Sequence, residues 1–281
     1  MKKLLTLILA LCVTFCGAIS LTSCGEEHSD DNRAVLKVGM ECAYQPYNWT
    51  QLDDSNGAVK ISGKTGQYAN GYDVKIAKII ADALNMRLEI YAYEFNSLVP
   101  AVESGALDLI IAGMSPTADR KLVIDFTNPY YESNLVVVVR KDGKYANATS
   151  IADLAGATIA AQVGTFHDDV VEQIASVTHR TLEDFPTMLT ALLSKNIDGY
   201  IAEEPGAIAD CNAKSELKYI GLVNNQTGFT VEDTTNVTLA VGIKKGSELL
   251  STINDIIDGI TVAQRTELMN EAISLAGSLG L

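Results

Sequence analysis

The chain has 281 residues and a formal net charge of −14 at neutral pH. This acidic balance disfavours nucleic acid and anionic membrane surfaces as partners and favours cationic ligands, because charges of like sign repel. The length suits one large domain or two lobes of ordinary size, which is ample for a hydrophobic core.

The N-terminus has the parts of a secretory signal. Lys2 and Lys3 precede an uncharged apolar run at residues 4–21, and small residues follow in "LTSC", which ends at Cys24. "LTSC" resembles the bacterial lipobox, which implies cleavage before Cys24 and attachment of lipid to its thiol. An uncleaved transmembrane anchor is the alternative, since the run approaches the ~20 residues that span a bilayer. In both cases the folded part lies outside the cytoplasmic membrane.

The segment after the signal peptide of residues 1–23 is strongly polar. Residues 24–33, "CGEEHSDDNR", predict a solvated tether. Removing the signal peptide leaves 258 residues, and the loss of its two lysines changes the formal charge from −14 to −16. Cys42 and Cys211 would pair only if the fold brought them together, and the sequence favours two unpaired, buried thiols.

Strands alternate with helices along the first half of the chain. Val74, Ala77 and Ile80 share one face of a helix predicted over residues 72–86. The patterns also predict strands at 35–40, 87–93, 106–113 and 134–140, a helix at 97–105, and turns or a hairpin within 50–70. The apolar run at 134–140 is long enough to leave one sheet and enter another.

The alternation restarts after residue 150. The patterns predict helices at 150–156, 165–175, 187–196 and 205–213 and strands at 157–162, 198–203, 217–222 and 236–245, with two helices closing the chain. Continuous apolar strands between helices are typical of a mainly parallel sheet that is covered on both faces. Two such series predict an α/β fold with two lobes.

The order of motifs is similar to that of the extracellular solute-binding proteins of polar amino-acid ABC importers. The segments that carry the resemblance are "VGMECAYQPYNW" (38–49), "GYDVKIAKIIADAL" (71–84), the whole of 95–141, "QVGT" (162–165) and "NIDGYIAEE" (196–204). The resemblance covers nearly all of the chain from Val35 onwards, and the block at 95–131, which contains "GMSPTADRKLVIDFTNPYY", is very specific to this family.

The resemblance implies a two-lobed clamp of the periplasmic-binding-protein type. Each lobe would be a mainly parallel sheet flanked by helices, with lobe 1 at 34–134 and 238–281 and lobe 2 at 135–237. Two crossing strands, near 132–136 and 236–240, would join the lobes. The implied protein is a lipid-anchored monomer outside the bacterial cytoplasmic membrane. It would bind an amino acid without metal or cofactor, deliver it to an ABC permease, and catalyse no reaction.

Arg120 is the predicted partner of the ligand's α-carboxylate. A guanidinium meets a carboxylate with two parallel hydrogen bonds, which a lysine cannot reproduce. In the family an arginine at this motif position binds that carboxylate, and backbone amides around Thr165 would help from across the cleft. The alternative is an arginine in a surface ion pair with Asp119 or Asp125.

Glu203 is the predicted partner of the ligand's ammonium group. The resemblance places a carboxylate at the end of the strand that matches "DGYIAE", and Glu203 occupies that position. The carbonyl of Gly113 and the side chain of Ser115 would add acceptors, with Met114 between them in the same segment. The alternative is an acidic pair, Glu203 and Glu204, that suits a helix N-terminus.

Aromatic residues would form the walls around the ligand's side chain. Tyr44 and Phe95 match the positions between which the family holds that side chain, and Trp49 and Phe166 are possible further walls. Aromatic faces also attract cations, by roughly 0.5–2 kcal/mol. Ordinary core packing is the alternative for all four residues.

Glu41 matches a position where receptors for lysine, arginine, ornithine or histidine carry a carboxylate that reaches the distal cation. A buried carboxylate without a cationic partner is costly, so the position favours cationic amino acids. Receptors for glutamine also keep an acid here, and a solvated glutamate at the end of a strand is a further alternative.

The sequence departs from the family pattern at three positions near the predicted site. Gly113 stands where many relatives have serine, Phe166 replaces a small polar residue, and His167 stands where many have glutamine. Two other functions stay open for this fold. One is a sensory amino-acid-binding lipoprotein, and the other is a cyclohexadienyl (arogenate or prephenate) dehydratase with an acid in the cleft as proton donor.

Overall fold

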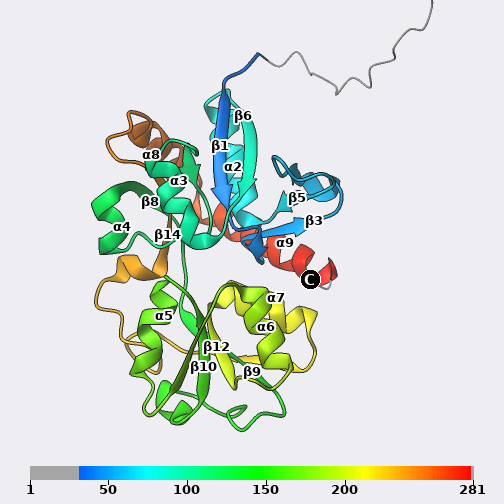
Figure 1. Cartoon of the computed structure of the whole chain (residues 1–281), viewed down its shortest axis with the longest axis vertical. Coiled ribbons are helices and arrows are strands. Elements are labelled where there is room, and N and C mark those ends of the chain that lie inside the picture. The colour runs from blue at the N-terminus through cyan, green and yellow to red at the C-terminus, as the bar shows by residue number, and fades with distance from the viewer. Residues whose placement is uncertain (1–31, 280–281) are drawn as a thin grey trace, which may run out of the picture. The chain divides into compact units, whose positions relative to one another are not determined.

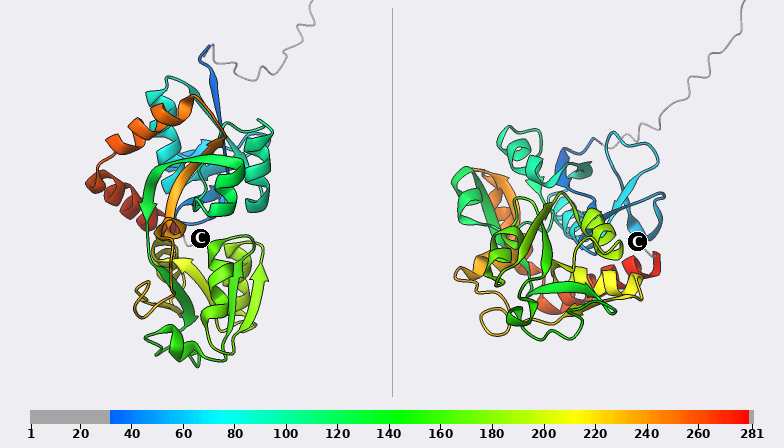
Figure 2. Two further views of the ribbon diagram at one scale, coloured as in Figure 1. Left: turned by 90° about the vertical axis from the view of Figure 1, so that its left-hand side faces the viewer. Right: turned by 60° about the horizontal axis from the view of Figure 1, so that its bottom comes forward.

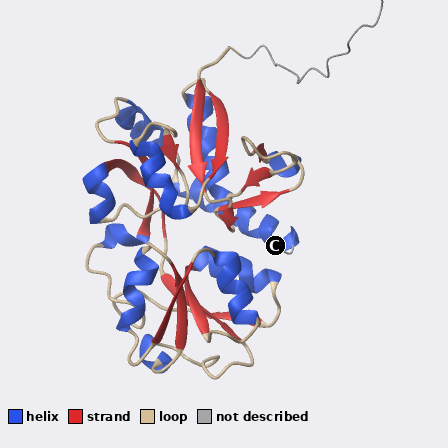
Figure 3. Cartoon of the chain, in the orientation of Figure 1, coloured by secondary structure: helices blue, strands red, loops and turns tan. Residues whose placement is uncertain are grey.

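Two five-stranded sheets and their flanking helices organise the part of the chain that the computed structural model describes, residues 32–279 (Figures 1 and 3). From residue 34 onwards, the described residues belong to one compact unit. The predicted signal peptide, Cys24 and most of the predicted tether lie outside the described residues. No helix between residues 32 and 279 combines the length and the apolarity needed to cross a bilayer.

The first sheet has the strand order β6-β1-β7-β14-β8. Its members are β6 (Arg87–Ala92), β1 (Val35–Met40), β7 (Leu109–Ile110), β14 (Thr238–Lys244) and β8 (Ile124–Glu132). The β1 strand pairs with β6 and β7 in parallel, whereas β14 runs antiparallel to β7 and β8. Four helices contact this sheet: α2 (Tyr72–Ala83), α3 (Leu98–Glu103), α4 (Ala118–Val123) and α8 (Leu249–Gly259).

The second sheet has the order β11-β10-β12-β9-β13. Its strands are β11 (Thr178–Leu182), β10 (Thr158–Gln162), β12 (Gly199–Glu203), β9 (Leu135–Arg140) and β13 (Leu217–Ile220), and the helices that contact it are α5 (Phe166–Val170), α6 (Phe185–Leu193) and α7 (Glu204–Ala213). Side chains of β9 alternate between two hydrophobic clusters, with Val136 and Val138 in one and Val137 and Val139 in the other. Both faces of this strand are therefore buried, which explains its uninterrupted apolar sequence.

The chain passes between the two sheets at two adjacent places. The first passage lies between the end of β8 at Glu132 and the start of β9 at Leu135. The return passage follows the 3-10 helix η5 (Thr234–Val237), and Thr238 of β14 then pairs with Glu132. The amide of Ser133 also donates to the carbonyl of Val237 at 3.3 Å. The two passages thus run side by side in opposite directions, as Figure 2 shows.

A small antiparallel sheet, β2-β3-β5-β4, covers one edge of the first sheet. Its strands are β2 (Ala43–Tyr44), β3 (Asn48–Gln51), β5 (Tyr68–Asn70) and β4 (Val59–Lys60), with the 3-10 helix η1 (Ser55–Gly57) before β4. The hairpin predicted within 50–70 is confirmed, because β4 and β5 pair antiparallel. Ile61 bridges to Ile90 of the edge strand β6, and the Ser62 amide donates to the Ile90 carbonyl at 2.7 Å. The segment therefore caps an edge that would otherwise expose unpaired backbone groups.

The predicted fold class is confirmed, with differences in detail. Each sheet contains two parallel and two antiparallel ladders, so the sheets are more mixed than the apolar runs suggested. Segment 150–156 forms only a 3-10 helix, η3 (Ile151–Leu154), and segment 165–175 divides into α5 and the 3-10 helix η4 (Val171–Gln173). The sequence did not predict β8, β11 or α4 (Ala118–Val123).

The C-terminal helix α9 (Val262–Leu279) packs on α7 as well as on α2, and so contacts both halves of the molecule. Cys42 and Cys211 are both free thiols, as expected. Cys42 is buried, but Cys211 is only half-buried, because it lies on α7 away from the fully buried positions of that helix. Burial raises the pKa of each thiol to about 12.

A buried polar network ties the small sheet to the first sheet. The carboxylate of Asp73 accepts hydrogen bonds from Asn48 Nδ2 at 2.8 Å and from the Tyr130 hydroxyl at 2.9 Å. The Gly113 amide donates to the same Tyr130 hydroxyl at 3.2 Å. Burial raises the pKa of Asp73 to about 6, although these hydrogen bonds oppose the shift. One carboxyl group therefore links β3, α2, β8 and the turn after β7.

This network predicts a pH-dependent contribution to stability. Because the pKa of Asp73 is higher in the folded chain, the folded state holds the proton more tightly than the unfolded state. The resulting stabilisation is present below the ordinary value of 3.8 and is lost as the pH rises through about 6. A shift of this size corresponds to on the order of 3 kcal/mol.

Urea unfolding of the wild-type chain and of Asp73→Asn at several pH values between about 4.5 and 7.5 measures this contribution. The free energy of unfolding of the wild-type chain should fall relative to that of the variant as the pH rises. A difference between the two chains that stays constant with pH would contradict the assignment.

Candidate functional site

A small cavity lies where loops from the two sheets meet. It is lined by Tyr44, Phe95, Gly113, Ser115, Arg120, Gln162, Thr165, Phe166, His167 and Phe185. Seven of these are predicted site residues: Tyr44, Phe95, Gly113, Ser115, Arg120, Thr165 and Phe166. The cavity has a volume of about 10 Å³, which is close to the space of one water molecule. The two halves must therefore separate before a molecule of amino-acid size can enter.

Arg120 lies on α4, and its guanidinium is held by carbonyl groups. Nη1 donates to the carbonyl of Ser115 at 2.7 Å, and Nη2 donates to the carbonyl of Gly164 at 2.8 Å. The guanidinium carbon also lies 5.1 Å from the centre of the Phe95 ring. Burial lowers the pKa of Arg120 to about 10, so the group stays charged at neutral pH.

The surface ion pair that was the alternative for Arg120 is absent from the described part of the chain. Asp125 instead lies 3.9 Å from Lys245 and accepts a hydrogen bond from the Gly246 amide. No carboxylate oxygen of residues 32–279 forms an ion pair with Arg120. The guanidinium is a largely desolvated cation whose contacts are neutral carbonyls, which suits it to binding an anion.

Glu203 is the last residue of β12 and is 3% exposed. The hydroxyl of Tyr44 donates to its Oε2 atom, and Nε2 of His167 lies 3.2 Å from the same atom. Burial raises the pKa of Glu203, but the charge and hydrogen bond of His167 and the hydrogen bond of Tyr44 outweigh it. The pKa of Glu203 is therefore lowered, and the group is an anion at neutral pH. Glu204 begins α7 and accepts a hydrogen bond from Tyr219, so it faces away from Glu203.

Aromatic rings close the cavity from both halves. Tyr44 stacks on Phe185 with ring centres 3.7 Å apart and planes inclined by 10°. Phe185 is not among the predicted site residues, because the sequence pattern places the start of this helix at residue 187, whereas α6 begins at Phe185. Asp184 caps that helix through a 2.8 Å bond from the Thr187 amide, and Pro186 lies in its first turn. The signal "DFPT" could have extended the helix back to Phe185.

Glu41 lies in a second cavity, which shares Phe95 with the first. This cavity has a volume of about 440 Å³ and is lined by Glu41, Glu94, Phe95, Asn96, Val163, Glu183, Asp184 and Thr187. Gln162 Nε2 donates to Glu41 Oε1 at 2.8 Å. Burial raises the pKa of Glu41 to about 7, the hydrogen bond from Gln162 lowers it, and Asp184 raises it further. Four carboxyl groups thus surround one cavity, which suits it to a cation.

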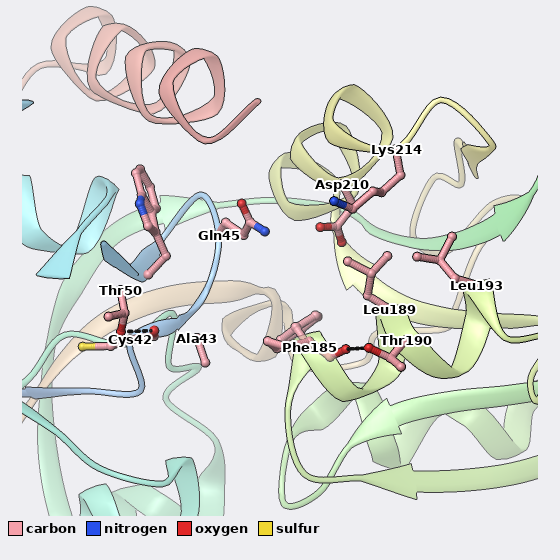
Figure 4. A pocket seen from close by; sticks show the side chains of 12 residues that line it. Cys42, Ala43, Gln45, Thr50, Phe185, Leu189, Thr190, Leu193, Asp210 and Lys214 are labelled. Atoms are coloured by element: carbon pink, nitrogen blue, oxygen red, sulfur yellow. Dashed lines mark hydrogen bonds between the residues drawn. The ribbon is translucent and has the colours of Figure 1, made fainter. Parts of the chain in front are cut away.

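Trp49 lies in a different place from the other predicted aromatic walls. It lines a third cavity of about 450 Å³, where α6 and α7 face the segment at 42–50 (Figure 4). The other lining residues are Cys42, Ala43, Gln45, Thr50, Phe185, Pro186, Leu189, Thr190, Leu193, Asp210 and Lys214. Trp49 is only 3% exposed, and its Nε1 atom has no partner. Trp49 therefore packs in the hydrophobic core, which is the alternative to a wall of the ligand site.

The remaining predicted residues support the backbone of the site. Met114 is buried, and its carbonyl accepts the amide of Ala240 at 3.1 Å, which ties the motif to β14. Thr165 is the N-cap of α5, and its hydroxyl donates to the carbonyl of Gln162 at 2.7 Å. Phe166 is half-buried at the cavity wall. Gln162 and His167 contact Glu41 and Glu203, which the sequence analysis did not predict.

Three polar contacts connect the two halves across the cleft. Arg120 donates to the Gly164 carbonyl, Tyr44 donates to Glu203, and Gln162 donates to Glu41. In each case the charged group comes from one half and its neutral partner comes from the other. The protein's own neutral groups therefore occupy positions at which a charged ligand could bind.

Comparison with known proteins gives a consistent result. A model of the bacterial extracellular solute-binding proteins, family 3, matches residues 36–271. The arginine-binding extracellular protein ArtP of Bacillus subtilis is 28% identical over 261 residues, which cover 90% of this chain and 91% of that protein. A probable histidine-binding protein of Campylobacter jejuni is 28% identical over 214 residues, 74% of this chain and 76% of that protein.

Solved structures include close matches to the fold. An amino acid ABC transporter substrate-binding protein from Streptococcus pneumoniae, bound to L-arginine, has a TM-score of 0.74 and 26% identity. The match covers 86% of this chain and 94% of that chain.

Gly113 predicts a stability test of how closely the turn after β7 approaches Tyr44. Its φ angle is +59°, and an added Cβ atom would lie 3.3 Å from the Tyr44 ring. Gly105 is a matched control, because its φ is +81° but an added Cβ would meet nothing within 4 Å. Gly105→Ala should lower the free energy of unfolding by about 1 kcal/mol, the cost of the left-handed conformation alone.

Gly113→Ala should cost more than Gly105→Ala, because the Tyr44 ring is stacked on Phe185 and must also shift. Urea unfolding of both variants checks this order. Equal decreases in the free energy of unfolding of the two variants would show that the Tyr44 ring moves aside without destabilising the protein.

Proposed function

The chain belongs to the bacterial extracellular solute-binding proteins of family 3, and we propose that it binds a free amino acid with a cationic side chain and delivers it to an ABC permease. The observation that carries the proposal is a pair of opposite charges at one cavity, the half-buried Arg120 and the buried Glu203. Arg120 lines the cavity, and Glu203 contacts it through Tyr44 and His167. A zwitterion offers one complementary group to each charge.

The proposed lobes are 34–134 with 238–281, and 135–237. Arg120, Tyr44 and Phe95 belong to lobe 1 in this division, whereas Glu203, Thr165 and Phe166 belong to lobe 2. The carboxylate of the ligand would replace the Gly164 carbonyl at Arg120, and its ammonium would take the place of a donor at Glu203. Binding at both charges would hold the lobes together, which is hinge closure.

The preference for a cationic side chain rests on the acidic cavity around Glu41. This cavity adjoins the first at Phe95, so a side chain that passes Phe95 would reach it. A guanidinium or ammonium there would take the place of Gln162 at Glu41. The relatives named for arginine and histidine support the same choice.

The proposal includes a lipid anchor at Cys24, a monomeric state and a membrane permease as partner. The lipobox-like "LTSC" and the polar segment that follows it support the anchor. A sensory lipoprotein would bind the same ligand, but deletion of its gene would leave amino-acid uptake unchanged. The lowered pKa of Glu203 does not favour the dehydratase alternative, because an ionised carboxylate is a poor proton donor.

Arg120→Ala should abolish measurable amino-acid binding while leaving a folded protein. Removal of one partner from a buried charge pair costs about 3–5 kcal/mol, out of the roughly 8 kcal/mol of a micromolar complex. Isothermal titration calorimetry measures the loss. Arg87→Ala is the control, because Arg87 pairs with Glu89 on β6 at 2.7 Å, outside the lining of the cavity.

The Arg87 variant should bind as the wild-type chain does. Near-native affinity in the Arg120 variant would refute the role of Arg120.

Glu41→Gln should weaken lysine or arginine far more than glutamine, by about tenfold to a hundredfold, because it removes a charged acceptor from the distal cation. The wild-type preference should also depend on pH. Glu41 is ionised above its pKa of about 7, so arginine should bind best relative to glutamine above that pH and lose its advantage below it.

Calorimetric dissociation constants for both amino acids between about pH 6 and 8 give this ratio. Equal weakening of lysine, arginine and glutamine in the variant would argue against the role of Glu41.

A further inference from the structure

His167 is a buried histidine at the carboxylate that the proposed function assigns to the ligand's ammonium. It is 7% exposed, and its Nε2 atom lies 3.2 Å from Glu203 Oε2. Its Nδ1 atom is buried and has no hydrogen-bond partner among residues 32–279. The residue lines the same cavity as Arg120. Neither sequence pattern nor helix capping requires a histidine at this position, since Thr165 caps α5.

The charges around Glu203 leave room for one cation. A protonated His167 and the ionised Glu203 form a neutral pair, and the Tyr44 hydroxyl completes the coordination of Oε2. An incoming ammonium group would bring a second positive charge to the same carboxylate. Two cations at one buried anion repel each other strongly, because the surrounding medium screens charges poorly. One of them must therefore lose its charge or leave.

We propose that His167 competes with the ligand for Glu203, so that binding of an amino acid releases a proton from His167. The inference rests on the proposed function, because it concerns the same site. With no amino acid bound, the imidazolium is the counterion of Glu203. When the ammonium binds, the proton on Nδ1, which has no hydrogen-bond partner among residues 32–279, passes to solvent. Nε2 keeps its hydrogen and its contact with Glu203, the carboxylate keeps its charge, and His167 stays in place as a neutral imidazole.

The presence of a histidine at this position makes the exchange depend on pH. An imidazole gains or loses its charge within the physiological pH range, whereas the ammonium of an amino acid stays charged there. Once His167 has lost its charge, the ligand would meet a Glu203 carboxylate without a counterion. While His167 holds its proton, each unit of falling pH would weaken binding by up to about tenfold, because the proton must be removed first.

Other ionisable groups face this pair and define the control. They are Tyr44 on β2, Arg120 on α4, Asp168 and Asp169 beside His167 on α5, and Asp210 on α7. The charge of Glu203 also interacts with Tyr47, Asp73 and Tyr131 and raises the pKa of each of them. Asp73 and Asp210 have pKa values of about 6, and Glu41 has one of about 7. Only the difference between the wild-type chain and a His167 variant isolates the proton of His167.

His167→Gln is the matched variant, because the glutamine amide can reach Glu203 as a donor but carries no charge. Titration of arginine into both proteins, in buffers of different ionisation enthalpy, counts the protons released. At about pH 5.5 the wild-type chain should release about one proton more per arginine than the variant, and at about pH 8.5 the two should agree. Its affinity should also fall more steeply with decreasing pH than that of the variant.

The outcomes separate this inference from the proposed function. Binding of arginine with equal proton release and parallel pH profiles in both proteins would overturn the role of His167 and leave the proposed function intact. No binding of any amino acid to the wild-type chain between those pH values would overturn both. Similar melting temperatures of the two proteins at about pH 8.5 would show that the variant is folded.

Discussion

The interaction on which the site depends is the opposition of a half-buried cation and a buried anion that do not pair with each other. Arg120 contacts carbonyl groups, and Glu203 contacts a phenol and an imidazole. Two such charges around one small cavity would normally form an ion pair, because each is costly to desolvate alone. Their separate positions in the fold prevent this. A ligand that carries one positive and one negative charge at the right spacing can then neutralise both groups without moving either of them.

The scaffold fixes these positions with few elements. Glu203 ends β12, where it pairs with Leu135 of β9, and the start of the same strand also pairs with β10. Arg120 follows the turn whose Gly113 amide hydrogen-bonds Tyr130, and Tyr130 in turn bonds Asp73. Met114 connects the same turn to β14. Glu203 therefore lies at the end of a strand, and Arg120 lies on the short helix α4. Buried polar contacts fix the turn that precedes this helix.

Much of the fold could be predicted from sequence, because long apolar runs such as the one in β9 mark strands that are buried on both faces. β8 escaped prediction because Asn128 and Pro129 interrupt its pattern, and its pairing with β14 absorbs the irregularity through register shifts. β11 is a mostly exposed edge strand and has no apolar pattern. At the site, family motifs identified Arg120 and Glu203. Phe185 and Gln162 could not be found in this way, since only the three-dimensional approach of the two halves brings them to Tyr44 and Glu41. The contact of His167 with Glu203 depends instead on how α5 lies beside the end of β12.

The paired passages between the sheets have a mechanical consequence. Because Thr238 is hydrogen-bonded opposite Glu132 and Ser133 opposite Val237, the connection is a two-stranded ribbon rather than two independent tethers. A ribbon bends and twists easily but resists sliding of one strand along the other. Motion of one half relative to the other is thereby restricted to a swing with few degrees of freedom. Each closing motion therefore brings the site residues of the two halves back to the same relative positions. A cleft whose residues come from distant parts of the chain can then form again with the same geometry.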